Sequence, residues 1–224
     1  RSQDALSLAR ELSHPSSIAH ALSFAAWFHQ LRGEREAVQA RVAEGIALAT
    51  EQGFSPRRAQ ADFLQGWLLV EQGHKEVGIA QMIAARAAGR AAASGRWDAH
   101  IAVLLADTYG KEGQTAAGLR VVNEELSRPQ ITGARFYEAE LYRINGELLL
   151  RQAAPDEELA ETCFKKAIEV ARRHQAKSLE LRAAMSLSRL WKRQGKKEEA
   201  RQLLAEIYGW FTEGFDTADL KQAK

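Results

Sequence analysis

The chain has 224 residues, and the 46% that are hydrophobic are enough to build a continuous core. Its 31 basic and 29 acidic residues leave a formal net charge of +2, which excludes a general electrostatic attraction to nucleic acid or to an anionic membrane. Cys163 is the only cysteine, so the chain has no internal disulfide and fits a reducing compartment, for which we expect the cytoplasm.

The first expected helix covers residues 3–12 and ends before Pro15. It is typical of the last helix of a preceding hairpin, so we expect the chain to be a piece of a longer one. The first complete hairpin is expected over residues 17–52, with its turn near Gly33.

The clearest hairpin covers residues 55–95. Ser55 is expected to cap its first helix, and Gly73 to end that helix, because glycine takes the left-handed backbone conformation at little steric cost. Gly66 and Gly78 fall on the facing sides of the two helices at helical spacing. Since neither has a side chain, we expect the two backbones to approach closely there.

The third hairpin begins near Trp97 and turns at Gly113, and its second helix is expected to stop before Pro129 because the residue before proline avoids the helical conformation. The later helices are expected, from apolar spacing, over residues 136–152, 156–174, 177–194 and 197–208.

The tail, residues 210–224, departs from this spacing and is expected to cap the array. Asp216 or Thr217 is placed to start a short closing helix, of which Leu220 is the first apolar anchor. The aromatic side chains expected to cover the end of the array are Trp210, Phe211 and Phe215.

The hairpins repeat at a step of 40 residues, or 42 where the fourth unit carries two extra residues. Small residues recur in the first helices at Ala26, Gly66, Ala106, Gly146 and Ser188. Their partners in the second helices are Val38, Gly78, Gly118, Ala160 and Ala200. The turn glycines are Gly33, Gly73, Gly113 and Gly195. Such a period predicts an all-α solenoid of antiparallel hairpins, each of which buries its apolar face on its neighbours.

At these positions the sequence resembles the tetratricopeptide repeat, whose mark is a small residue in the first helix, a glycine at the turn and a small residue early in the second helix. The resemblance covers residues 18–209 and implies a right-handed solenoid. We therefore expect one domain over 1–224, with the end of a preceding hairpin at 1–15, five repeats of about 40 residues at 17–209 and a cap at 210–224. The family's usual period is shorter, and HEAT-type repeats have about this length; the paired small residues around a glycine turn favour the first interpretation.

No sequence motif points to catalysis, to a cofactor or to a metal site. HExxH, CxxC, GxGxxG and GxSxG patterns are absent, and no two histidines have the spacing that would hold a metal on one helix face. No apolar run approaches the ~20 residues that cross a bilayer. We expect no enzyme, no cofactor, no nucleic acid and no membrane partner.

The resemblance implies that the first helices line a concave face that binds an extended or helical peptide. Carried over by position, the groove residues are Trp27, Phe63, Trp67, Val103, Asp107, Arg143, Glu147, Arg182, Arg189 and Arg193. This groove is aromatic at its N-terminal end and charged at its C-terminal end, where residues 172–201 hold 10 basic and 3 acidic residues.

Each half of this groove has two interpretations. Trp27 and Trp67 are either exposed anchors for a peptide or rings tucked between hairpins as core. The basic residues are either a solvated face or a site for an acidic segment of the partner.

The sequence therefore predicts a non-enzymatic module that binds a protein or peptide. Its tail and spacing also resemble the C-terminal helical regions of large bacterial signalling proteins that join an adenylate cyclase or a transcription activator to an ATPase, which implies a regulatory role. The alternatives left open are a small-ligand sensor domain and a homo-oligomer that self-associates through residues 1–15.

Overall fold

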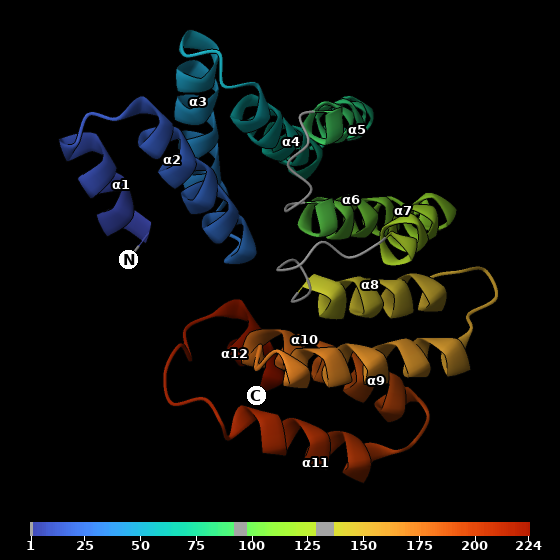
Figure 1. The fold of residues 1–224 in the computed structure, drawn as a ribbon. Helices are drawn as coiled ribbons and strands as arrows, with labels where there is room; N and C mark the ends of the chain where they lie inside the picture. Colours follow the sequence, from blue (N-terminus) through green and yellow to red (C-terminus); the bar gives the residue numbers. More distant parts are fainter. Residues whose placement is uncertain (1, 92–97, 129–136) are drawn as a thin grey trace. The chain divides into compact units, whose positions relative to one another are not determined.

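The computed structural model describes residues 2–91, 98–128 and 137–224, which form twelve helices and no strand (Figure 1). The helices are α1 (Ser2–Glu11), α2 (Pro15–Leu31), α3 (Arg35–Glu51), α4 (Ser55–Glu71), α5 (Lys75–Ala91), α6 (Asp98–Lys111), α7 (Thr115–Ser127), α8 (Glu138–Leu150), α9 (Glu157–Arg173), α10 (Lys177–Arg193), α11 (Lys197–Tyr208) and α12 (Ala218–Ala223). The all-helical, hairpin-repeat architecture expected from the sequence is confirmed. The expected starts at Trp97 and Phe136 lie outside the described residues.

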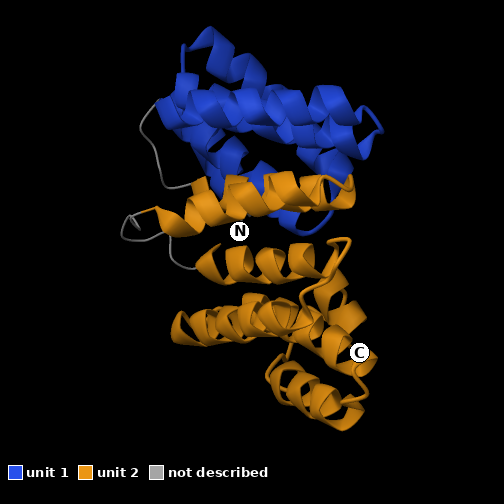
Figure 2. Ribbon diagram, turned by 90° about the vertical axis from the view of Figure 1, so that its right-hand side faces the viewer, with its two compact units in different colours: residues 1–95 blue, residues 96–224 orange. Residues whose placement is uncertain are grey.

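The chain divides into two compact units, shown in different colours in Figure 2. Unit 1, residues 1–95, contains α1 to α5, and unit 2, residues 96–224, contains α6 to α12. In unit 1, α2 packs on α3 and α4 packs on α5; in unit 2 the pairs are α6 with α7, α8 with α9 and α10 with α11. In both units each hairpin also packs on the next one within that unit. No helix in the described part of the chain is long and apolar enough to span a membrane.

Gly73 shows how a hairpin turn forms. Its φ of 96° is in the left-handed region, and the N–H of the following residue, His74, donates to the Leu69 carbonyl at 2.8 Å. This bond and the one from the Gly73 N–H to the Val70 carbonyl satisfy two carbonyls that the helix end would otherwise leave open. All four predicted turn glycines have positive φ, at Gly33, Gly73, Gly113 and Gly195.

The start of α4 differs from the expectation at Ser55. The helix begins one residue earlier than expected, so Phe54 is the N-cap and no side chain caps the helix. Ser55 is already inside the first turn, with its N–H bound to the Gly53 carbonyl at 3.0 Å. The sequence-based assignment of Ser55 as the cap was wrong because the turn at Gly53 starts the helix earlier.

Gly66 of α4 and Gly78 of α5 are in the close contact that the sequence predicted. A Cβ atom on Gly66 would lie 2.7 Å from the Gly78 carbonyl oxygen, and one on Gly78 would lie 2.5 Å from the Gly66 carbonyl oxygen. Real Cβ atoms do not approach backbone this closely, and backbone on two packed helices cannot move aside cheaply. The α4–α5 crossing therefore depends on both glycines.

A matched pair of substitutions in α5 tests this crossing. We expect Gly78→Ala to lower the free energy of unfolding by about 2–3 kcal/mol, because the new methyl group forces the helices apart. Gly89→Ala should raise it by about 0.5–1 kcal/mol, because its Cβ would meet Ala59 at an ordinary 3.9 Å and the helix loses a flexible residue. Urea unfolding of the two variants measures both values, and the same sign for both would contradict the close approach.

The apolar residues of the tail contribute unequally to the core of unit 2. Leu220 of α12 is buried in the core that α8 to α11 share, as expected, and Phe211 packs against the same core. Trp210 and Phe215 are exposed, so these two rings cover less of the end than the sequence suggested.

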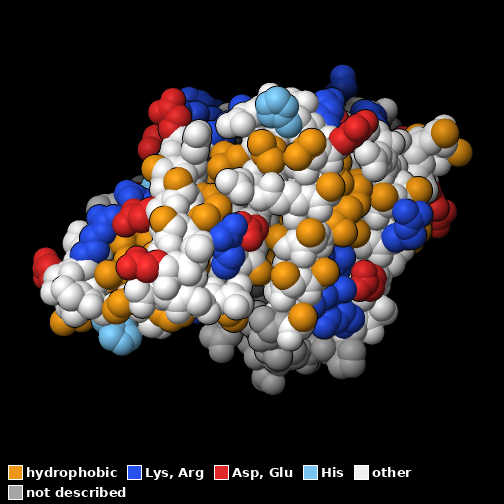
Figure 3. Space-filling view, turned by 90° about the horizontal axis from the view of Figure 1, so that it is seen from above, with side chains coloured by type: hydrophobic (Ala, Val, Ile, Leu, Met, Phe, Trp, Pro, Cys, Tyr) orange, Lys and Arg blue, Asp and Glu red, His pale blue; other side chains and the backbone are white. Residues whose placement is uncertain are grey.

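Unit 1 exposes large apolar side chains on its first two helices, and in Figure 3 hydrophobic side chains reach the surface between charged and polar ones. The exposed apolar residues of α1, α2 and the turn between them are Leu8, Leu12, Phe24, Phe28 and Leu31. Homo-oligomer formation through the N-terminal residues stays a prediction, which a mass measurement in solution would test.

Candidate functional site

The three aromatic residues of the expected groove are core residues of the structure. Trp27, Phe63 and Trp67 are only 2%, 0% and 5% exposed. The expectation that their rings are open to a partner is corrected, and the alternative interpretation as core holds. Val103 of α6 is buried as well.

The packing of α2 on α4 explains this burial. Both helices are the first helices of neighbouring hairpins, and they contact each other. The Trp27 ring of α2 stacks on the Phe63 ring of α4, with ring centroids 5.9 Å apart. A residue next to the small one on a first helix therefore fills the space between two hairpins.

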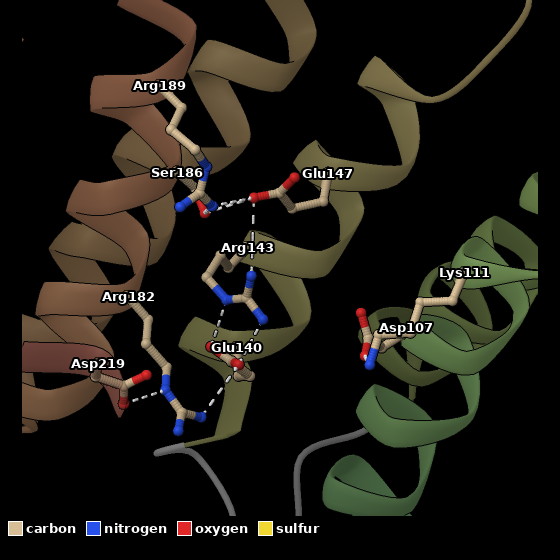
Figure 4. A network of polar contacts seen from close by, with 9 residues as sticks. All are labelled: Asp107, Lys111, Glu140, Arg143, Glu147, Arg182, Ser186, Arg189 and Asp219. Carbon is tan, nitrogen blue, oxygen red and sulfur yellow. Dashed lines mark hydrogen bonds and ion pairs between the residues drawn. The ribbon is translucent and has the colours of Figure 1, made fainter. Parts of the chain in front are cut away.

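The charged half of the expected groove lies in unit 2, where side chains of α8 and α10 form a polar network (Figure 4). Two neighbouring first helices again face each other, but here they carry charged residues. We call the following set the α8–α10 face: Glu140, Arg143, Glu147, Arg182, Ser186 and Arg189.

Glu140 is the centre of the α8–α10 face. Its side chain is 5% exposed and accepts two bonds from the Arg143 guanidinium, at 2.8 and 2.7 Å. The Arg182 guanidinium of α10 lies 3.6 Å away. Burial alone would raise the pKa of the Glu140 carboxyl, but the two arginines outweigh burial and hold the pKa below its usual range.

Glu147, two turns further along α8, joins the same helices. Its Oε1 accepts hydrogen bonds from the Ser186 hydroxyl at 2.7 Å and from the Arg189 guanidinium at 2.8 Å. Burial opposes ionisation of this carboxyl, yet its bonds to Ser186 and Arg189 lower the pKa. The Glu147 carboxylate of α8 therefore connects α8 to α10.

A side chain outside the expected groove completes the network. Asp219 of α12 accepts a hydrogen bond from the Arg182 Nε at 2.8 Å (Figure 4). Sequence reasoning placed Asp216, Thr217 and Leu220 in the tail but gave Asp219 no role. Its helix follows the repeats at a different spacing, so no periodic signal marked it.

The remaining groove residues lie at the edges of this network. Asp107 of α6 binds Lys111 of its own helix at 2.8 Å, and its charge also acts on Arg143. Arg193 at the end of α10 pairs with Glu157 of α9 at 3.3 Å, away from the α8–α10 face. Of the ten expected groove residues, the network in Figure 4 brings together five: Asp107, Arg143, Glu147, Arg182 and Arg189.

Beside Glu140, His100 of α6 is buried against the Tyr137 ring, with centroids 4.4 Å apart. Burial lowers the pKa of the His100 imidazole from 6.5 to about 3, and the charge of Arg182 adds to this while that of Glu140 opposes it. His100 is therefore neutral near pH 7 in the folded chain.

This buried histidine makes stability depend on pH. The unfolded chain binds a proton at His100 more readily than the folded chain, so unfolding becomes easier as pH falls below 6.5. We expect the free energy of unfolding to fall by about 2 kcal/mol between pH 7 and pH 5 from this group. His100→Leu should remove that loss and His174→Gln, at an exposed site, should keep it. Equal pH profiles of wild type and His100→Leu would contradict the expectation.

Unit 1 contains a cleft of about 670 Å³ between α3, α4 and α5. Alanines form much of its lining. At its polar side, the Arg58 Nε donates a bifurcated hydrogen bond to the two Asp62 carboxylate oxygens, at 2.8 and 2.9 Å. The cleft is open to solvent and is not the closed apolar pocket that would mark a ligand sensor.

The chemistry that the α8–α10 face supports is ionic binding. Its groups are guanidinium, carboxylate and hydroxyl, and the Ser186 hydroxyl donates a hydrogen bond to the Glu147 carboxylate. In the described residues, no group of three His, Cys, Asp or Glu side chains is placed to hold a metal ion.

Comparison with known proteins informs the fold. No family model and no curated protein matches the chain. Two solved structures of a putative kinesin light chain from Podosopora anserina with nearly identical TPR-like repeats, one of them carrying a substitution, are similar with a TM-score of 0.53 and 14% identity. Each match covers 88% of this chain and 95% of the other. The chain thus has the fold of a TPR-like helical repeat array.

Proposed function

We propose that the chain is a non-enzymatic interaction module that binds a protein or peptide on the α8–α10 face. The observation that carries this proposal is that four expected groove residues lie together on the α8–α10 face: Arg143, Glu147, Arg182 and Arg189. A TPR-like fold is a common scaffold for peptide binding, and its first helices commonly supply the contacts.

The electrostatics of this face favour a charged partner segment. Arg189 is 57% exposed while its partner Glu147 is 18% exposed, so the guanidinium can exchange one carboxylate for another at little desolvation cost. Charged groups of this kind select partners and speed association more than they add affinity. An acidic segment of the partner is therefore the chemistry that fits.

We further propose that the chain acts in the cytoplasm as a regulatory segment of a bacterial signalling protein. This proposal rests on the resemblance of the tail and the repeat spacing described above, and it fits a cysteine content that needs no oxidising compartment.

Selection from a random peptide library displayed on phage tests the binding proposal. We expect acidic peptides to be enriched, and Arg189→Glu to weaken their binding about tenfold in fluorescence anisotropy. Arg201→Glu is the matched control, because Arg201 is also an exposed arginine paired with a glutamate, at 2.5 Å, on another helix. Selected peptides that bind Arg189→Glu as tightly as wild type would contradict the proposal.

A small-ligand sensor is a second candidate function. The α3–α5 cleft lacks the closure expected of a sensor site, but its volume of about 670 Å³ lies within the ~300–1,000 Å³ of small-molecule sites. A library of small metabolites is expected to give a rise in melting temperature that the cleft-filling variant Ala88→Trp removes. A rise that survives this substitution would place the ligand elsewhere.

A further inference from the structure

Helix α12 is a short segment that lies against the α8–α10 face. It packs on α10 and α11, and Figure 4 shows its Asp219 beside Arg182. Leu220 is its one buried side chain, and Ala223 is partly buried against the same core. Lys221 and Gln222 point to solvent.

Few interactions hold this segment in place. A six-residue helix is not stable in water by itself. Burial of one leucine contributes about 1.5–3 kcal/mol, and a partly exposed ion pair contributes about 0–1 kcal/mol. The Arg182 and Asp219 side chains are 21% and 29% exposed, so water screens their pair. The attachment of α12 is therefore weak enough for a peptide of micromolar affinity to displace it.

Departure of α12 would change the charge of the surface that it leaves. With Asp219 in place, the polar network has four basic and four acidic side chains; without it, four basic and three acidic side chains remain. The uncompensated positive charge is that of Arg182. Its remaining carboxylate neighbour, Glu140, is 3.6 Å away and already accepts two hydrogen bonds from Arg143. The vacated surface would present a guanidinium next to the apolar site of Leu220.

We propose that residues 216–223 occupy in cis the part of the binding face that a partner uses, and that this partner presents a carboxylate followed directly by an aliphatic side chain, as Asp219 and Leu220 do. This inference rests on the proposed function and names the partner chemistry and its regulation. The tail is then an internal competitor: the partner binds only when it replaces α12.

The tether sets the strength of this competition. A link as short as residues 209–217 holds the released segment at an effective concentration of about a millimolar. For a segment whose own dissociation constant is about 100 μM, the surface is occupied about nine-tenths of the time, and the apparent affinity for an outside peptide falls about tenfold.

The test uses the full chain and a fluorescent synthetic peptide of residues 213–224. Leu220→Asp places a charge in the apolar site and is expected to release α12 from the chain. In anisotropy titrations we expect the peptide to bind Leu220→Asp about tenfold more tightly than wild type. Gln222→Asp, which adds the same charge at an exposed position of the same helix, should behave as wild type.

One further variant and one altered peptide test the proposal even if Leu220→Asp disturbs the fold. Asp219→Asn removes only the ion pair and should shift peptide binding in the same direction by a smaller factor. A peptide in which Asp219 and Leu220 are both replaced by alanine should not bind any variant.

Equal peptide binding by wild type and Leu220→Asp, or no binding to either, overturns the cis-occupant proposal. The proposed function is tested separately: it is wrong if the library-selected peptides bind Arg189→Glu as tightly as wild type. If those peptides depend on Arg189 but bind wild type and Leu220→Asp equally, the α8–α10 face binds partners and α12 does not compete.

Discussion

Replacement of Glu140 by alanine is expected to lower the free energy of unfolding by about 4 kcal/mol. Glu140 is the buried carboxylate that compensates Arg143 and part of the charge of Arg182. Removing one partner of a buried pair leaves the other charge desolvated and uncompensated, which costs about 3–5 kcal/mol. Urea denaturation followed by circular dichroism at pH 7 measures the loss.

The control for this prediction is Glu198→Ala. Glu198 and Arg201 form a pair with the same three-residue spacing, but their side chains are 72% and 73% exposed on α11. Water already solvates both charges, so we expect no measurable change in stability. Similar effects of the two substitutions would show that burial of Glu140 contributes nothing.

Replacement of Phe63 by alanine is expected to lower the free energy of unfolding by about 4 kcal/mol as well. The ring is fully buried and stacked on Trp27, and loss of a buried phenylalanine costs about 3–5 kcal/mol through the lost contacts and the cavity left behind. Thermal and urea unfolding of Phe63→Ala measure the effect.

This second prediction separates the two interpretations of the aromatic residues. A groove anchor would lose partner binding on truncation and keep its stability, whereas a core ring loses stability first. Phe24→Ala is the matched control, since Phe24 lies on α2 with much of its ring in solvent. Unchanged stability of Phe63→Ala would contradict the burial of Phe63 in the core and would favour its interpretation as an exposed anchor for a peptide.

The fold was predictable because its determinants are local and repeated. Gly73 ends a helix by its own backbone freedom, and Gly66 and Gly78 recur in register with small residues of the other hairpins. The structure confirms the turns and the close approach, and it places most of the helix ends where the sequence predicted them.

The environment of the site residues was only partly predictable. Helical spacing tells which residues share a face, but the burial of Trp27 depends on how closely α4 packs on α2, which spacing does not encode. Similarly, the sequence did not show which carboxylates pair with Arg182 of α10, because its partners, Glu140 and Asp219, come from α8 and α12.

Hydrogen–deuterium exchange of the full chain with and without a library-selected acidic peptide tests most directly whether the α8–α10 face binds partners. We expect slower exchange in α8 and α10 and faster exchange in α12 when the peptide is bound. Protection confined to α2 to α5, with α8 and α10 unchanged, would contradict this account.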